Sequence, residues 1–300
     1  MSSSPPAAAT SGANALAIGA LLLGATAIAT SALFVKVSET GPVATAFWRV
    51  FLALPLLGLW SALDRRSSRG ANFSNDRSLL IAAGLFFAGD LAVWHWSIVL
   101  TSVANSTLLA NLAPIFVALT AWLIFRNRLS GRFLAGLIIA VAGMALLIGG
   151  DFQLRGRELI GDALGVVTAM FYAGYQLVVT KLRTRVATSA LMAWSGVVTA
   201  LVLLPIALIS GEQMLPVSTT GWVKLAGLAL ISQVAGQSLI AYAMAHLPAT
   251  FSSVGLLFQP VMATLFAWLL LGEAVSALQL AGGATVLVGI RMVHLAENAR

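Results

Sequence analysis

Residues 105–125 read NSTLLANLAPIFVALTAWLIF, and residues 251–271 read FSSVGLLFQPVMATLFAWLLL. Both runs have a proline in the middle, an amide side chain just before it and an Ala-Trp-Leu triplet after it; a shift of 146 residues superposes Pro114 on Pro260. A proline inside a helix removes one backbone hydrogen bond and frees a carbonyl group four residues earlier. At membrane depth such a defect persists only where protein or a water-filled cavity accommodates it. The two runs therefore predict a pair of interrupted membrane helices, a pattern that indicates a transport site.

The composition is that of a membrane protein. Of 300 residues, 59% are hydrophobic and 9% are charged, and the mean hydropathy is +0.95, whereas about 25% of the residues in a soluble domain are charged. Cysteine is absent, which excludes disulfides and thiolate metal sites, and we expect no metal and no cofactor. The net charge of +7 does not indicate nucleic acid, because the basic residues are spread over short loops. Residues 1–14, rich in Ser, Pro and Ala, are expected to form a disordered tail.

Apolar runs of a length that spans the hydrocarbon of a bilayer, about 18–23 residues, recur along the rest of the chain. They predict an all-α, polytopic membrane protein with ten transmembrane helices. The predicted helices cover residues 15–35, 43–63, 78–98, 102–125, 132–149, 159–179, 188–209, 221–242, 247–271 and 277–295.

The positions of lysine and arginine predict that both termini are cytoplasmic. With the N-terminus inside, twelve of these residues fall in inner loops and the C-terminal tail. Four fall in outer loops: Lys36, Arg155, Arg157 and Lys224. Cytoplasmic loops of membrane proteins carry such an excess of basic residues.

The shift of 146 residues extends beyond the two proline runs and indicates a duplication. Because each unit has five helices, the second half enters the membrane from the opposite side, so the halves are predicted to be inverted repeats. The predicted repeats are residues 15–149 and 150–300. Glycines in the fifth and tenth runs suit close helix packing. The matched pairs are Trp48 with Trp194, Trp96 with Tyr242, Gly136 with Gly282, and Gly143 with Gly289.

On these features the sequence resembles the EamA-type, ten-helix branch of the drug/metabolite transporter superfamily. The resemblance rests on the duplicated unit, on residues 47–49 (Phe-Trp-Arg) and on a proline in the fourth and ninth helices. It also rests on Gly272-Glu273, which lead into residues 280–283 (Leu-Ala-Gly-Gly) of the tenth helix. Within this branch the chain is similar to the YddG-type exporters of aromatic amino acids.

The resemblance implies a secondary carrier of the bacterial inner membrane. Its central cavity would be lined by helices one, three, four, six, eight and nine. The first half has Arg126-Asn127 where the family has Gly-Glu, so a role of that acidic residue carries over only to Glu273. We expect Glu273 to act in gating and Pro114 and Pro260 to act as hinges.

Asp90 is the most costly residue of the predicted membrane interior, because a carboxylate there costs about 2.5–3.5 kcal/mol on insertion scales. It shares a helical face with Trp94, and a carboxylate beside an aromatic ring can hold an amino-acid ammonium group. The alternative is a purely structural Asp90, protonated or hydrogen-bonded to another helix. His95 either couples protons to transport or is a neutral, packed side chain. Arg49 either snorkels to the membrane surface or meets a buried acid or a substrate carboxylate.

Uncharged amide and phenol groups complete the candidate site. They suit hydrogen bonds to a zwitterion, although hydrogen bonds between helices would explain them equally well. The candidate substrate-binding residues are Asp90, Trp94, His95, Trp96, Asn111, Tyr172, Tyr175, Gln176, Gln233, Gln237, Tyr242 and Gln259.

The favoured function is export of amino acids with aromatic or apolar side chains, and of similar amphipathic metabolites, by alternating access. Sugar phosphates would require several convergent basic groups, whereas Arg49 is the only clearly intramembrane one. The alternatives are transport of another small metabolite or a drug-like cation, a channel or receptor, and a membrane enzyme. An enzyme has little support, because the three histidines are scattered and form no HExxH motif. The expected partners are a small-molecule substrate and the lipid bilayer, with the chain a monomer or weak homodimer.

Overall fold

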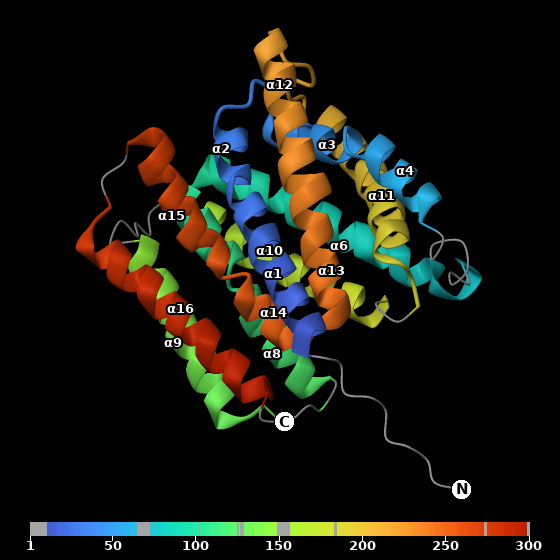
Figure 1. The fold of residues 1–300 in the computed structure, drawn as a ribbon. Helices are drawn as coiled ribbons and strands as arrows, with labels where there is room; N and C mark the ends of the chain where they lie inside the picture. The colour runs from blue at the N-terminus through green and yellow to red at the C-terminus, as the bar shows by residue number, and fades with distance from the viewer. Residues whose placement is uncertain are drawn as a thin grey trace, which may run out of the picture.

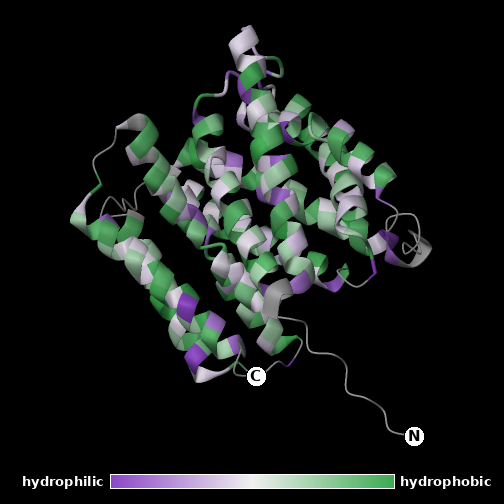
Figure 2. Ribbon diagram, viewed as in Figure 1, coloured by the Kyte–Doolittle hydropathy of each residue, from purple (hydrophilic) through white to green (hydrophobic). Residues whose placement is uncertain are grey.

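The computed structural model describes residues 11–64, 73–101, 103–124, 126, 129–148, 157–182, 185–272 and 275–298. Within these ranges the chain is helical and contains no strand. Figure 1 shows one bundle, in which α1 begins and α16 ends on the same side. Figure 2 shows that hydrophobic residues cover most of each helix, while many of the hydrophilic ones lie near helix ends. Most of the predicted tail (residues 1–10) and the expected gating residue Glu273 lie outside the described residues.

The helices confirm a multi-pass membrane protein. In the described part of the chain, nine helical segments are long and apolar enough to cross a membrane, and the apolar helix at Gly131–Leu147 is shorter. The elements are α1 (Ser11–Ala29) and α2 (Ser31–Lys36), α3 (Pro42–Phe51) and α4 (Leu54–Leu63), α6 (Phe73–Leu100), α7 (Val103–Ala110) and α8 (Ala113–Leu123), α9 (Gly131–Ile148), α10 (Arg157–Leu182), α11 (Thr188–Ile209), α12 (Thr219–Gly227), the π-helix η1 (Leu228–Gln237) and α13 (Ser238–His246), α14 (Ala249–Gly255) and α15 (Phe258–Leu271), and α16 (Ala277–Asn298).

Both predicted interruptions are present, and they lie at matching positions. The fourth membrane helix breaks between α7 and α8, and the ninth breaks between α14 and α15. At each break a backbone amide bonds to the carbonyl three residues earlier, from Leu112 to Leu109 (3.1 Å) and from Leu257 to Val254 (3.0 Å). Pro114 and Pro260 lie in the first turn of the helix that follows, where the missing N–H group has no intrahelical acceptor.

Further irregularities are not predicted by the sequence, and two of them lie in the first and eighth membrane helices. The first membrane helix bends between α1 and α2, where the Thr30 hydroxyl donates a hydrogen bond to the Ala27 carbonyl (2.7 Å). Such bonds from Ser or Thr to the preceding turn bend helices. The eighth membrane helix contains the ten-residue π-helix η1, in which Ser232, Gln233 and Gln237 are buried. π-Helical turns are rare and often lie at functional sites.

The last helices of the two halves pack backbone to backbone, as their glycines predict. Figure 1 shows α9 and α16 side by side at one edge of the bundle. A Cβ atom on Gly143 would lie 2.9 Å from the Gly282 carbonyl oxygen, and one on Gly136 would lie 3.0 Å from that of Gly289. A methyl group at these positions would therefore force the helices apart.

The third and sixth membrane helices, α6 and α10, pack through a reciprocal glycine–phenylalanine contact. A Cβ atom on Gly89 would lie 2.6 Å from the Phe171 ring, and one on Gly174 would lie 2.5 Å from the Phe86 ring. In the same way α1 packs on η1 and α13, so the first helix of each half contacts the third helix of the other. This exchange of partners is what inverted repeats produce, and it places the middle of α6 and α10 at the centre of the bundle.

Candidate functional site

A cavity of about 350 Å³ lies among the central helices, within the usual range for small-molecule sites, about 300–1,000 Å³. It extends from the two helix breaks, represented by Asn111 and Pro260, to the end of α2 at Lys36 and the beginning of α16 at Gln279. The end of α2 and the beginning of α16 lie on the side of the bundle opposite to the start of α1 (Figure 1). The charge pattern predicts that this side faces the outside of the cell.

Half of the twelve candidate residues line this cavity, together with Pro260. They come from α6, α10, η1, α15 and the break between α7 and α8. The six are Asp90, Trp94, Asn111, Tyr172, Gln237 and Gln259.

Asp90 and Arg49 bring opposite charges to the cavity wall. Both residues line the cavity, and their charges attract each other. Arg49 is only 3% exposed, and its Nε donates a hydrogen bond to Oε1 of Gln233 on η1 (3.2 Å). Arg49 therefore does not snorkel to the surface; it joins α3 to η1 and brings a positive charge to the cavity that Asp90 also lines.

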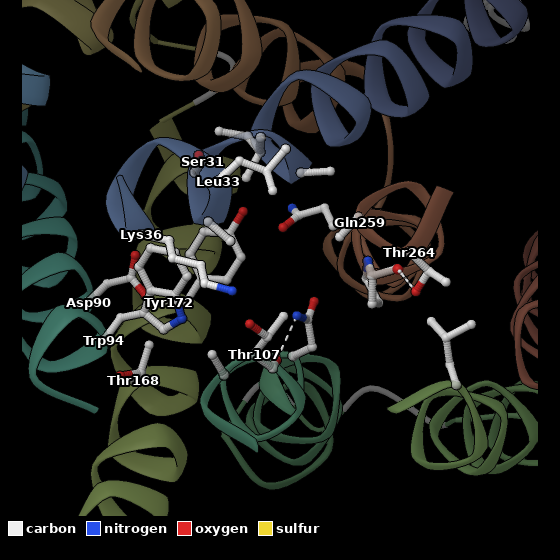
Figure 3. Close-up of a pocket in the computed structure, with 18 of the residues that line it drawn as sticks. Ser31, Leu33, Lys36, Asp90, Trp94, Thr107, Thr168, Tyr172, Gln259 and Thr264 are labelled. Atoms are coloured by element: carbon white, nitrogen blue, oxygen red, sulfur yellow. Dashed lines mark hydrogen bonds between the residues drawn. The ribbon is translucent and has the colours of Figure 1, made fainter. Parts of the chain in front are cut away.

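Aromatic rings form the wall next to Asp90. Trp94 lies one turn beyond it on α6, and Tyr172 faces it from α10 (Figure 3). The Tyr172 ring stacks on that of Tyr175, with centroids 6.2 Å apart and planes inclined by 8°. Tyr175 also packs against Phe87 at 5.0 Å. Tyr175 is thus a candidate that supports the wall from behind, since it is 1% exposed and not part of the lining.

Amide groups supply the neutral polar part of the lining. The Asn111 amide donates to the Thr107 carbonyl (2.8 Å) at the first break. Within the described part of the chain, Nε2 of Gln237, Nε2 of Gln259 and Oγ of Ser31 are buried and have no hydrogen-bond partner. Buried polar atoms in native proteins are nearly always paired, so these atoms are available to a ligand.

The other candidates lie away from the lining. His95 is fully buried, and its Nδ1 donates a hydrogen bond to the Leu91 carbonyl (2.6 Å). This geometry agrees with the alternative of a packed side chain. Trp96 is 41% exposed, and its Nε1 points to Glu212 (3.4 Å). Gln176 is buried outside the lining, and the Tyr242 ring packs 4.4 Å from that of His246. Gln233 contacts Arg49 and has no place in the lining.

Several lining residues were not predicted as site residues. The charge pattern predicts Lys36 in an outer loop, and Trp268 belongs to the Ala-Trp-Leu triplet that marks the repeat. The sequence contains no clear signal for the bend after α1. The one hint at Lys36 is that the repeat places it one residue out of register with Lys181. Hydroxyl groups gave no signal, because Ser and Thr are common in membrane helices. The unpredicted polar and aromatic lining residues are Ser31, Lys36, Phe87, Thr107, Thr168, Thr264, Trp268 and Gln279.

The chain is similar to known membrane transporters. It matches the model of the EamA-like transporter family over residues 15–149 and 159–295. An uncharacterised transporter of Archaeoglobus fulgidus is 26% identical over 89% of this chain and 93% of its own length. A probable terminal-alkyne amino-acid exporter of Streptantibioticus cattleyicolor is 27% identical over 67% of each chain. The pseudopaline exporter CntI of Pseudomonas aeruginosa is 26% identical over 70% of this chain and 72% of its own length.

A solved crystal structure supports the fold. It superposes on 97% of this chain and 100% of its own with a TM-score of 0.77, at 19% sequence identity.

Proposed function

Since the chain belongs to the EamA-like transporter family, we propose that it is a secondary carrier that exports zwitterionic amino acids with aromatic or apolar side chains. Similar small amphipathic metabolites would share the route across the inner membrane. That the protein is a multi-pass membrane transporter follows from its family and helices. The substrate and direction are the proposed part.

One observation carries the proposal: a carboxylate, aromatic rings and unpaired amide groups face the same cavity at the level of the helix breaks. Asp90 would bind the substrate ammonium group, and Trp94 and Tyr172 would add cation–π attraction. The amide groups of Gln237 and Gln259 would donate to the carboxylate. Apolar parts of the wall such as Phe87 would receive the substrate side chain. Two relatives are named as an amino-acid exporter and a pseudopaline exporter, and these names agree with a substrate of this chemistry.

The paired breaks supply the proposed mechanism. The two five-helix halves would rock about the central site and bend where α7 meets α8 and where α14 meets α15. Pro260 lines the cavity, whereas Pro114 is buried outside its lining. The two equivalent prolines thus have different surroundings. Alternating access leads to this difference, because in any one conformation the two repeats are arranged differently around the site.

Transport by purified protein in proteoliposomes tests the proposal. Vesicles loaded with a panel of labelled amino acids should show saturable flux of aromatic and apolar members, which unlabelled substrate inhibits. Flux measured with and without an imposed pH gradient would identify a role of protons. Flux that is linear in concentration and not inhibited would indicate a channel. No flux of any amino acid would overturn the proposal.

A further inference from the structure

The cavity wall contains hydrogen-bond donors, among them Ser31 and Lys36 from α2 and Gln259 from α15 (Figure 3). We propose that this wall binds the substrate carboxylate and that Lys36 makes a carboxylate a requirement for recognition. This inference rests on the proposed function and assigns a residue to its specificity.

The bend at Thr30 brings Lys36 to the cavity. α2 begins at Ser31 and ends at Lys36, and both residues line the cavity. In Figure 3 the Lys36 side chain extends into the cavity on the side of Tyr172 and Trp94. Within the described part of the chain, the Lys36 ammonium group forms no ion pair and no hydrogen bond. Lys36 is therefore a cation held at a cavity wall without a counter-ion.

The charge balance distinguishes Lys36 from Arg49. Arg49 is buried, donates to Gln233 and is offset by Asp90. The charges of Arg49 and Asp90 cancel, so among the described residues the cavity lining carries one excess positive charge, that of Lys36. A carboxylate would neutralise this charge, whereas an amine without a carboxylate would be repelled by it. Discrimination of this kind combines attraction of one ligand with repulsion of another.

The neighbouring neutral donors point to the same ligand group. Oγ of Ser31, a residue only 2% exposed, and Nε2 of Gln259 have no partner in the described part of the chain. The ammonium nitrogen of Lys36 and the amide nitrogen of Gln259 are hydrogen-bond donors, whereas an ionised carboxylate only accepts hydrogen bonds. A carboxylate is therefore the matching group. A substrate that lacks the carboxylate would leave these donors unpaired, which is how a site rejects an otherwise similar compound.

The inference is tested with two ligands that differ in the carboxylate alone, phenylalanine and 2-phenylethylamine. Binding to purified protein in detergent is measured for the wild type and for Lys36→Met and Lys36→Arg. Lys224→Met is the matched control, because Lys224 lies outside the cavity and donates to the Val37 carbonyl (3.1 Å). Like Lys36→Met, Lys224→Met removes one positive charge from the side of the protein that is predicted to face outward.

We expect the wild type to prefer phenylalanine over the amine, and Lys36→Met to reduce phenylalanine affinity by about 10- to 100-fold, as for a lost hydrogen bond to a charged group. The affinity for 2-phenylethylamine should stay equal or increase in Lys36→Met, which also shows that the variant is folded. Lys36→Arg should retain most of the preference, and Lys224→Met should retain all of it.

Equal affinity of the wild type for both ligands would overturn the inference, as would an unchanged preference in Lys36→Met. In either case, continued transport of phenylalanine would leave the proposed function intact. If the wild type neither binds nor transports any amino acid, the proposed function fails, and the inference fails with it.

Discussion

Nε of Arg49 donates a hydrogen bond of 3.2 Å to Oε1 of Gln233, 184 residues further along the chain. The bond joins a helix of the first half to the π-helix of the second, and it fixes Arg49 in the lining of the cavity that Asp90 also lines. A buried charge that depends on partners from two other helices makes the assembly of the halves sensitive to single substitutions.

Arg49→Met should therefore destabilise the folded protein by about 1.5–3 kcal/mol, the usual worth of a hydrogen bond from a charged group, because it removes the bond to Gln233 and the charge that offsets Asp90. The double variant Arg49→Met/Asp90→Asn should recover part of the loss, because no unpaired charge then remains. Thermal unfolding of the wild type, both single variants and the double variant in detergent measures the coupling. Strictly additive effects would show that the two charges do not interact.

Asp90→Asn should abolish amino-acid binding and should lower thermal stability less than Arg49→Met does, because Arg49 keeps its hydrogen bond to Gln233. The physical reason is that a neutral amide cannot attract an ammonium group as a carboxylate does. Asp76→Asn is the matched control on the same helix, since Asp76 pairs with Arg185 (3.3 Å) outside the cavity. It should leave binding unchanged. Unaltered transport by Asp90→Asn would assign Asp90 to a structural role.

Pro114→Ala and Pro260→Ala should slow turnover more than they weaken binding, because alanine allows a continuous helix where the chain is now interrupted. Pro205→Ala serves as the control, since Pro205 lies inside α11 and outside the cavity lining. Exchange rates and binding affinities are measured on the same preparations. A turnover rate equal to that of the wild type in both variants would contradict the hinge proposal.

Gly143→Ala should lower the melting temperature, because the new methyl group would lie 2.6 Å from the Val286 amide nitrogen and 2.9 Å from the Gly282 carbonyl oxygen. Gly58→Ala, in α4, should be neutral or stabilising by about 0.5–1 kcal/mol, since nothing lies within 4 Å of its added Cβ atom and alanine favours helix. Thermal unfolding of the two variants separates the cost of a steric clash between α9 and α16 from the gain in helix propensity. Equal melting temperatures would show that α9 and α16 can separate without cost.

Glu39 gives the loop after α2 a dependence on pH. The Ser218 hydroxyl donates to its carboxylate (2.6 Å), as do the Ser218 and Val217 amides (3.0 and 3.1 Å). The bond from the Ser218 hydroxyl is the main cause that lowers the pKa of Glu39 below its ordinary value. A lowered pKa means that this group stabilises the folded loop above its unfolded pKa and that the effect is lost as pH falls through the folded pKa.

Hydrogen exchange of the Val217 and Ser218 amides checks this expectation. At neutral pH, Glu39→Gln should exchange these amides faster than the wild type, because a neutral amide is the weaker acceptor. As pH falls through the lowered pKa of Glu39, the two proteins should converge. A difference that persists at low pH would show that the charge of Glu39 does not hold the loop.

The membrane helices could be predicted from the sequence because bilayer thickness fixes their length. The predicted run 188–209 coincides with α11, and both proline interruptions fall where the sequence placed them. The glycines of α9 and α16 were also informative, since small residues at helical spacing in a membrane helix favour close approach of a neighbouring helix.

The site was predicted less well, because the face that a residue presents depends on which helices surround it. Trp94, His95 and Trp96 are consecutive and point in three directions, so one enters the cavity, one packs inside and one is exposed. Periodicity also fails across η1, because a π-helix does not follow the α-helical repeat. Lys36 was missed since the bend at Thr30 turns an expected loop residue toward the centre.

The interrupted helices give the cavity an electric polarity that does not depend on ionised side chains. Peptide dipoles sum to about half a positive elementary charge at a helix N-terminus and about half a negative one at a C-terminus. Where α7 ends and α8 begins, beside Asn111, both signs occur within one turn at the cavity wall. A charged side chain at this depth would cost about 2.5–3.5 kcal/mol, whereas the broken backbone presents both polarities without one. A zwitterion, which also carries both signs and no net charge, is the solute whose own dipole matches such a wall.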